Sequence, residues 1–154
     1  MEDRMYKVFS PNDSKVAMKV IPGHFVTTHS HITHYVDMTT LRARQNEAEA
    51  AARILASKYA NNTPVDSIIC LNGCEVIGAY LAQELSRSGI RCMNAHETIY
   101  VTAPEQDING QMIFRDNYEP MINGKNILVL NGSITTGSTL NRAIESVLYY
   151  GGKI

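Results

Sequence analysis

The feature that most constrains the fold is an apolar tetrapeptide followed at once by a loop of small polar residues and an amphipathic helix. Residues 127–130 read ILVL, and such a continuous apolar run is typical of a strand buried on both faces of a parallel sheet. Residues 131–139 read NGSITTGST. Apolar residues then recur at spacings of three and four up to residue 148, which predicts a helix. The order strand, loop, helix is that of a parallel βα unit.

The chain upstream shows the same alternation of apolar runs and amphipathic stretches. The expected elements are helices over 46–59 and 77–85, the second ended by Gly89, and strands over 65–71, 90–94 and 100–102. The side chains expected to pack on the sheet are Ala48, Ala51, Ala52, Leu55 and Tyr59 in the first helix and Leu140, Ala143, Ile144, Val147 and Leu148 in the last. This alternation predicts an α/β fold with a mostly parallel sheet and helices on both of its faces.

Two further regions have weaker patterns. Residues 1–24 read as loop and short strand, and residues 25–28 and 35–38 as short strands on either side of a histidine-bearing turn. The polar stretch 104–124 reads as a long excursion with a small hairpin around residues 112–114. The sequence stops at Ile154, where another strand is expected to begin, so we expect the domain to be truncated there.

Composition limits the classes of partner. The formal net charge is -1 and the 14 basic residues are spread along the chain, so we expect neither nucleic acid nor membrane as a partner. The first ten residues lack the apolar core of a signal peptide. Three cysteines without framework spacing favour a reduced, cytoplasmic setting. A small anionic ligand would therefore need a local site on this protein.

The loop at 131–139 is the strongest candidate for such a site. A loop between a buried strand and a helix gathers backbone N–H groups and the positive end of the helix around one point, which favours phosphate. Glycine lets the backbone approach an anion, and hydroxyls add hydrogen bonds. The alternative is that these residues only cap a helix, but a cap needs one hydroxyl and this loop has five between Ser133 and Thr139. The residues predicted to hold a phosphate are Thr135, Thr136, Gly137, Ser138 and Thr139.

The strand, loop and helix over residues 127–140 resemble the phosphoribosyl-pyrophosphate (PRPP) motif of type I phosphoribosyltransferases. Residues 71–82 look like the pyrophosphate loop and following helix of that family, and residues 25–35 look like the N-terminal hood of its orotate-specific branch. The resemblance implies a 5′-phosphate site at the loop, Asn131 and Gly132 beside the ribose, and a hood over residues 1–40 on a core over residues 41–154. It also implies that Asn72, Gly73, Cys74 and Glu75 border the pyrophosphate, and that Thr28, His29 and Tyr35 contact the base.

The implied reaction is orotate plus PRPP to orotidine 5′-phosphate plus pyrophosphate, with Mg²⁺ brought by PRPP rather than held by an obvious protein site. A homodimer is also implied. The chain departs from the family pattern at three places. Asn131 and Gly132 stand where two acids usually hold the ribose, and Ile77 stands where the orotate branch has a basic residue. Arg115 is the cation of the excursion at 104–124 that could act in catalysis. These departures leave a second hypothesis, a non-catalytic module of the same fold that binds PRPP or a nucleotide.

Several weaker features keep more than one interpretation. His29, His31 and His34 could line a base pocket, bind a metal or lie on the surface. Cys74 is expected to be a small buried filler or to line the pocket. Glu75 is expected to contact Mg²⁺ or the ribose, or to stabilise the start of a helix through the helix dipole. The arginines at positions 42, 44 and 53 are expected on a solvated face, unless one reaches a partner subunit.

Overall fold

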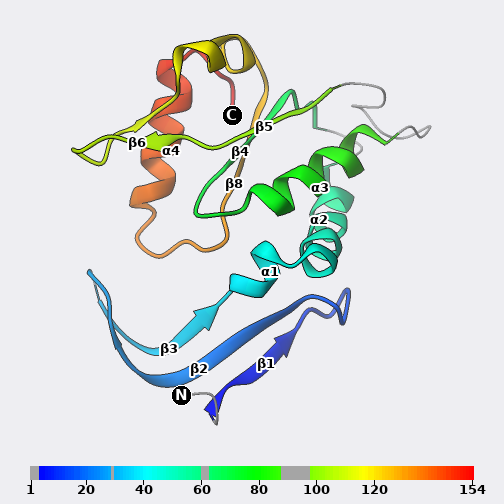
Figure 1. The fold of residues 1–154 in the computed structure, drawn as a ribbon, viewed down its shortest axis with the longest axis vertical. Helices are drawn as coiled ribbons and strands as arrows, with labels where there is room; N and C mark the ends of the chain where they lie inside the picture. The colour runs from blue at the N-terminus through cyan, green and yellow to red at the C-terminus, as the bar shows by residue number, and fades with distance from the viewer. Residues whose placement is uncertain (1–3, 29, 60–62, 88–97) are drawn as a thin grey trace.

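The computed structural model describes residues 4–28, 30–59, 63–87 and 98–154 of the chain, and Figure 1 shows an antiparallel sheet below a larger α/β body. The antiparallel sheet contains β1 (Tyr6–Phe9), β2 (Ala17–Val26) and β3 (His31–Asp37) in that order. The body is built on a parallel sheet of β4 (Ser67–Cys70), β5 (Tyr100–Thr102) and β8 (Ile127–Leu130), in the order β5-β4-β8. The predicted α/β class with a parallel sheet is confirmed.

Helices cover both faces of the parallel sheet. The helices are α1 (Thr39–Ala43), α2 (Gln45–Tyr59), α3 (Glu75–Ser86) and α4 (Ser138–Tyr149). Side chains of β4 alternate between two apolar clusters: Ile68 packs with α2 and α3, whereas Ile69 packs with α4 on the other face. All four residues of β4 are buried, as the continuous apolar run predicts.

Two side chains predicted to pack on the sheet are largely outside the core. Tyr59 is 37% exposed and Leu148 is 57% exposed. Tyr59 lies past Ala56, the last buried residue of α2, whereas Leu148 follows the fully buried Val147 and lies outside the buried face of α4. Periodicity marks the apolar stripe of each helix but does not show how far along or around the helix the packing surface extends.

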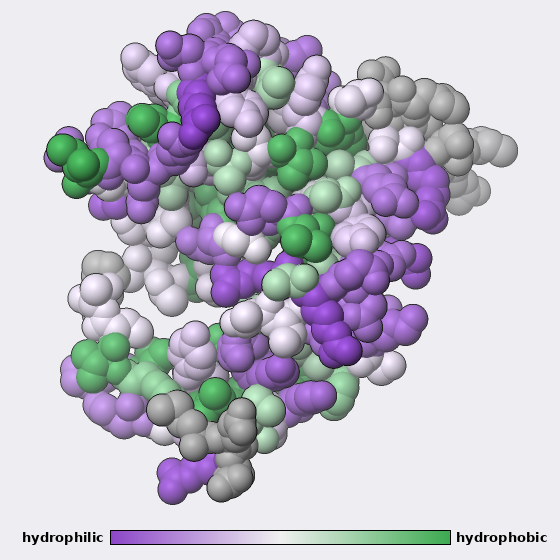
Figure 2. Space-filling model, in the orientation of Figure 1, coloured by the Kyte–Doolittle hydropathy of each residue, from purple (hydrophilic) through white to green (hydrophobic). Residues whose placement is uncertain are grey.

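The N-terminal region is more regular than the sequence indicates. Residues 17–26 form one ten-residue strand with a register shift between Pro22 and Phe25, and His31 and His34 lie in β3 rather than in a turn. Cross-strand pairing overrides the local turn signal of Pro22 and Gly23, because the irregularity accommodates a proline inside a strand. Figure 2 shows a notch between this sheet and the body at one side of the molecule.

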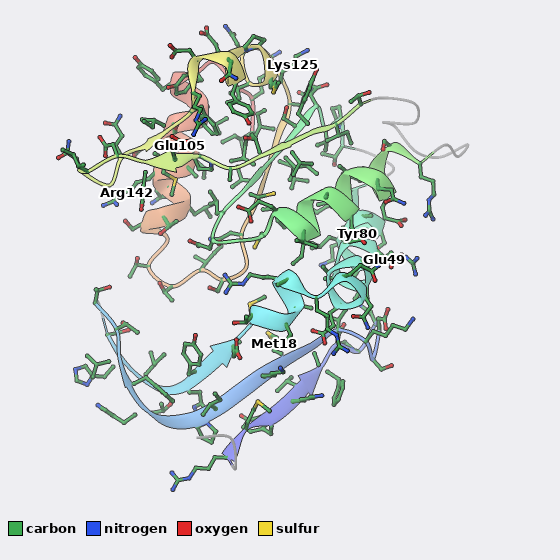
Figure 3. The ribbon with its side chains drawn as sticks, in the orientation of Figure 1. Met18, Glu49, Tyr80, Glu105, Lys125 and Arg142 are labelled. Atoms are coloured by element: carbon green, nitrogen blue, oxygen red, sulfur yellow. The ribbon has the colours of Figure 1, made fainter. Side chains whose placement is uncertain are left out.

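The excursion between β5 and β8 contains the predicted hairpin, formed by β6 (Glu105–Gln106) and β7 (Met112–Ile113). A 3-10 helix, η2 (Asp116–Met121), follows it. After α4 the chain returns to the parallel sheet, where Asn126 and Lys153 form an isolated parallel bridge. Figure 3 shows Glu105 on the hairpin and Arg142 on α4 at the same end of the body.

Some expectations fall on residues that the structure does not describe. These are the strand at 90–94, the helix end at Gly89, and His29 of the hood segment. In the described ranges, no helix has the length and apolar character needed to cross a membrane.

Candidate functional site

The candidate site lies at the carboxyl ends of β4 and β8, which are adjacent and parallel. From β4 the chain goes first to β5 on one side and later to β8 on the other side. The strand order therefore reverses between β4 and β8. Open α/β sheets bind ligands in the crevice at such a point. In Figure 1 the loop between β8 and α4 lies on the side of the body that faces β2 and β3.

The loop before α4 closes around a small hollow of about 130 Å³. Gly137 is the N-cap of α4 and has φ +81°, a left-handed conformation that glycine adopts without strain. Its missing side chain leaves the first turn of the helix open to a ligand. The residues that line the hollow are Asn72, Asn131, Ser133, Ile134, Thr135, Thr136, Gly137, Ser138, Thr139 and Leu140. All five residues predicted to hold a phosphate therefore surround one cavity, although their binding role stays a prediction.

The alternative that these hydroxyls only cap the helix has little support in the geometry. No side-chain hydrogen bond caps α4 at Gly137. The Ser138 backbone N–H donates to Thr136 Oγ1 at 3.4 Å, which is long for such a bond. Because the first N–H groups of a helix lack partners within it, they remain available to an anion in the hollow.

The loop after β4 meets the loop after β8 directly. Asn72 Nδ2 donates to Asn131 Oδ1 at 2.9 Å. Asn72 and Gly73 both have positive φ, +53° and +76°, and asparagine tolerates this conformation better than most residues. The predicted pyrophosphate loop and the predicted ribose residue thus lie side by side, as the proposed ligand would require.

Arg42 of α1 contacts the loop after β4, which corrects the expectation that it lies on a solvated face. Its Nη1 donates to the Asn72 carbonyl oxygen, and a Cβ on Gly73 would lie 4.0 Å from that nitrogen. Its Cδ lies 3.5 Å from the position that a Cβ on Gly132 would take. The side chain is half-buried, whereas Arg44 and Arg53 are 66% and 53% exposed.

Nothing in the local sequence distinguishes Arg42 from its neighbours. Its role depends on α1 being placed against the ends of β4 and β8, and helical periodicity does not encode that placement. The positive charge also acts on nearby groups. The pKa of Asp37 is lowered, mainly by hydrogen bonds from Thr39, with a smaller contribution from Lys19 and Arg42.

Cys74 is fully buried and packs in the core, in agreement with its interpretation as a small buried filler, and its place beside the pyrophosphate stays a prediction. Burial raises the pKa of its thiol, although Arg42 and the backbone N–H of Gly132 act in the opposite direction. Burial also raises the pKa of Cys70 to about 12. Both thiols are therefore small core groups rather than reactive ones.

A second cavity of about 210 Å³ continues the site toward the hairpin. It shares Asn72 and Thr139 with the phosphate hollow, so the two cavities adjoin. The exposed Glu75 lines it together with Gln106 of the hairpin. An elongated ligand could thus extend from the loop at 135–139, past Asn72, to Glu75.

Other predicted site residues lie apart from these cavities in the described part of the chain. Arg115 Nη2 is paired with Glu105 Oε1 at 2.5 Å, its side chain is 69% exposed, and this pairing raises its pKa. Tyr35 is 47% exposed and stacks near Phe25, with ring centroids 5.7 Å apart. Thr28 is exposed. Their roles as catalytic and hood residues stay predictions.

Among the described histidines of the N-terminal sheet, His24 and His31 form a pair. His31 Nδ1 lies 3.0 Å from His24 Nε2. Among the described residues, no three His, Cys, Asp or Glu side chains come together in a way that could hold a metal ion.

Comparison with known proteins supports the fold. No protein-family model and no curated protein matches this sequence. Two solved structures of Mycobacterium tuberculosis H37Rv orotate phosphoribosyltransferase are similar, one in complex with Fe(III) dicitrate and one in complex with inorganic phosphate. Each has a TM-score of 0.57 and 15% sequence identity over 87% of this chain, and the match covers 71% and 70% of the two solved chains. The chain therefore has a fold like that of type I phosphoribosyltransferases.

Proposed function

We propose that this protein binds the ribose 5′-phosphate part of PRPP or of a nucleotide in the hollow at residues 135–139. The main support for this proposal is the start of α4, which has no side-chain cap and where Gly137 opens the first helical turn to a cavity lined by hydroxyls. Backbone N–H groups and the helix dipole favour a dianion at this point. The similarity to a phosphoribosyltransferase whose solved structure contains inorganic phosphate supports this assignment.

The leading reaction is phosphoribosyl transfer from PRPP to orotate, giving orotidine 5′-phosphate and pyrophosphate. Negative charge builds on the pyrophosphate as it leaves, and a fixed cation that faces it lowers the barrier. Arg42 is held at the Asn72 loop by a hydrogen bond and could supply that charge without moving. The orotate branch has a basic residue at the position of Ile77, which is buried in this chain. We propose that Arg42 supplies the positive charge in its place.

The residues of the site do not fit a Mg²⁺ ion held by the protein. Asn131 Oδ1 already accepts a hydrogen bond, Gly132 has no side chain, and Glu75 is the carboxylate that lines the adjoining cavity. Hard cations such as Mg²⁺ prefer carboxylates and phosphate oxygens. We therefore propose that any Mg²⁺ arrives with the phosphates of the ligand, and that binding of a single 5′-phosphate does not need it.

The second candidate is a binding module without turnover, in a homodimer or alone. Its specific support is that the ribose side has Asn131 and Gly132 instead of two acids, and that Arg115 is engaged with Glu105. Without two acids at the ribose and with Arg115 paired to Glu105, the protein can still bind the 5′-phosphate in the ground state while it no longer stabilises the transition state.

Two measurements separate the candidates. Calorimetry with PRPP, orotidine 5′-phosphate and ribose 5-phosphate tests binding, and loss of orotate absorbance in the presence of PRPP and Mg²⁺ tests transfer. We expect all three phosphorylated ligands to bind. Turnover at an ordinary enzymatic rate supports the transferase, binding without turnover supports the module, and no binding of any of the three contradicts both.

A further inference from the structure

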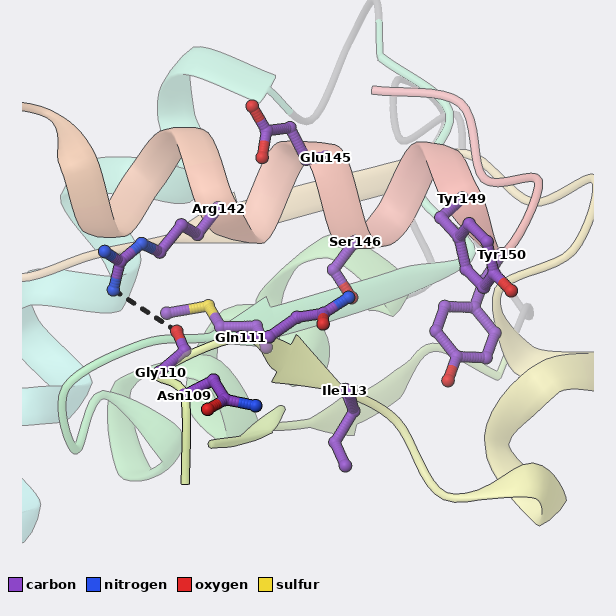
Figure 4. Close-up of a pocket in the computed structure, with 10 residues that line it drawn as sticks. Asn109, Gly110, Gln111, Ile113, Arg142, Glu145, Ser146, Tyr149 and Tyr150 are labelled. Atoms are coloured by element: carbon purple, nitrogen blue, oxygen red, sulfur yellow. Dashed lines mark hydrogen bonds between the residues drawn. The ribbon is translucent and has the colours of Figure 1, made fainter. Parts of the chain in front are cut away.

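A further cavity lies along α4, apart from the hollow at the start of that helix. It is a groove of about 490 Å³ between α4 and the β6–β7 hairpin (Figure 4). None of its lining residues lines the hollow at 135–139, and only Met112 is shared with the adjoining cavity. Its volume is in the range of small-molecule sites, which is about 300–1,000 Å³.

One end of the groove is cationic. Arg142 Nη1 donates to the Gly110 carbonyl oxygen at 3.2 Å, which holds the guanidinium against the tip of the hairpin. None of the ion pairs found within the described ranges involves Arg142. Glu145 also lines the groove, but among the described residues it forms no ion pair with Arg142. This end therefore suits an anion, and a guanidinium pairs well with phosphate oxygens.

The middle of the groove carries an unsatisfied polar group. Ser146 Oγ is buried and has no hydrogen-bond partner among the described residues, and the residue as a whole is 7% exposed. Figure 4 shows this side chain pointing toward Gln111 on the hairpin. Buried hydroxyls without a partner are uncommon, so Ser146 Oγ is a hydrogen-bonding group that the described residues leave unused. Asn109 and Gln111 add amide groups along the same wall.

The other end of the groove is aromatic. Tyr149 and Tyr150 pack edge to face, with ring centroids 5.4 Å apart, and Tyr150 is anchored by a hydrogen bond from its hydroxyl to the Phe114 carbonyl oxygen at 3.0 Å. Tyr149 is 85% exposed, so its ring is available to a ligand. Arg142 and Tyr149 are seven positions apart on one helix face, which separates them by about 10 Å along the axis.

We infer that this groove binds a nucleoside 5′-monophosphate, as a second site distinct from the one proposed above. The phosphate pairs with Arg142, the ribose hydroxyls meet Ser146 and the amides of Asn109 and Gln111, and the base stacks against Tyr149. The order cation, hydrogen-bonding groups, aromatic ring matches the order phosphate, ribose, base.

The test is the stoichiometry of uridine and adenosine 5′-monophosphate binding, measured by calorimetry with the full chain. We expect two nucleotides per chain. The R142Q variant removes the positive charge and should weaken the groove site about tenfold or more. The S146A variant removes only the unsatisfied hydroxyl and should weaken it about two- to tenfold without lowering the melting temperature. The R87Q variant at the C-cap of α3, a helix that packs on the opposite face of the parallel sheet, is the matched control and should change neither site.

A double variant of the other loop, T136A with G137A, should remove the first site and leave the groove site intact. If the chain binds one nucleotide, and this binding is lost in the double variant but unchanged in R142Q, the groove site is overturned and the proposed function stands. One nucleotide lost only in R142Q keeps the groove and overturns the proposed function. Inorganic phosphate and uridine alone should each bind the groove at least about tenfold more weakly than uridine 5′-monophosphate; equal binding of phosphate alone overturns the assignment to a nucleotide.

Discussion

Asn72 Nδ2 donates a hydrogen bond to Asn131 Oδ1 at 2.9 Å, joining two loops that are 59 residues apart in the sequence. The bond forms where the carboxyl ends of β4 and β8 lie side by side. It links the phosphate hollow to the loop that Arg42 holds from the other side. Three segments thus meet at the candidate site: the loop after β4, the loop after β8 and Arg42 of α1. Each segment can be tested by a substitution of its own.

The G137A substitution should weaken binding of ribose 5-phosphate, because alanine disfavours φ +81° by about 1–2 kcal/mol and its methyl group projects into the approach of an anion. The matched control is G124A, since Gly124 has φ +72° and a Cβ at that position would meet open space, as it would at Gly137. Both variants should lose similar stability in urea. Only G137A should lose affinity in calorimetry, and equal loss in both would remove the loop from the site.

The R42Q substitution should weaken binding of PRPP and pyrophosphate by about 10- to 150-fold, the equivalent of about 1.5–3 kcal/mol for a hydrogen bond to a charged group. Ribose 5-phosphate should bind almost as before, because the hollow at 135–139 lies on the other side of Asn72. R44Q, two residues along and exposed, is the control. A loss of ribose 5-phosphate affinity as large as that for PRPP would show that Arg42 supports the structure of the loop rather than binding the pyrophosphate.

The N131D substitution should make binding of ribose 5-phosphate depend on Mg²⁺. A carboxylate beside the ribose repels the phosphate, and a divalent cation can offset that repulsion. In the unmodified chain, calorimetry with and without Mg²⁺ should give similar affinities. The control is N123D, which introduces the same charge before the amino-terminal end of β8. Its binding of ribose 5-phosphate should not depend on Mg²⁺. A strong Mg²⁺ requirement in the unmodified chain would contradict the proposal.

Cys70 and Cys74 should resist alkylation in the folded protein at pH 8, because burial raises both pKa values and the thiolate is the reactive form. The measurement is mass spectrometry after iodoacetamide treatment of a C92S variant, with and without urea. Labelling should appear only in urea. Rapid labelling of the folded protein at either position would disprove the burial of that thiol.

The raised pKa of Cys70 also links stability to pH. Its folded value of about 12 exceeds the ordinary 9.0, so the folded state holds a proton that the unfolded state releases above pH 9. The contribution is present below pH 9 and is lost as pH rises toward 12. The urea midpoint should fall over that window less steeply in a C70A variant than in the unmodified chain.

The G78A substitution should destabilise the protein despite the higher helix propensity of alanine. A Cβ at Gly78 would overlap Cys70 Sγ and lie 3.2 Å from Val101 Cγ1, so α3 packs too closely on β4 and β5 to accept it. Overpacking costs about 1–3 kcal/mol, more than the roughly 1 kcal/mol gained from propensity. Adding C70A should recover part of the urea midpoint, and no recovery would place the strain elsewhere.

Local sequence pattern was sufficient for the elements of the core. The continuous apolar run at 127–130, the similar run ending at Leu71, and the spacing after residue 138 each predicted an element that the structure contains. The cluster of five hydroxyls at 133–139 likewise indicated a phosphate loop before any geometry was known, and these residues do surround a hollow. Such features depend on neighbours within a few residues, which the sequence lists directly.

Only the tertiary structure decided which distant segments meet. The positions of Arg42 against Asn72, of Arg115 against Glu105, and of the hairpin against α4 all follow from how whole elements pack. The long strands of the N-terminal sheet and the exposed Leu148 have the same origin. Periodicity records which face of an element is apolar, but the partner that covers the face is chosen by long-range packing, whose free energy no single segment contains.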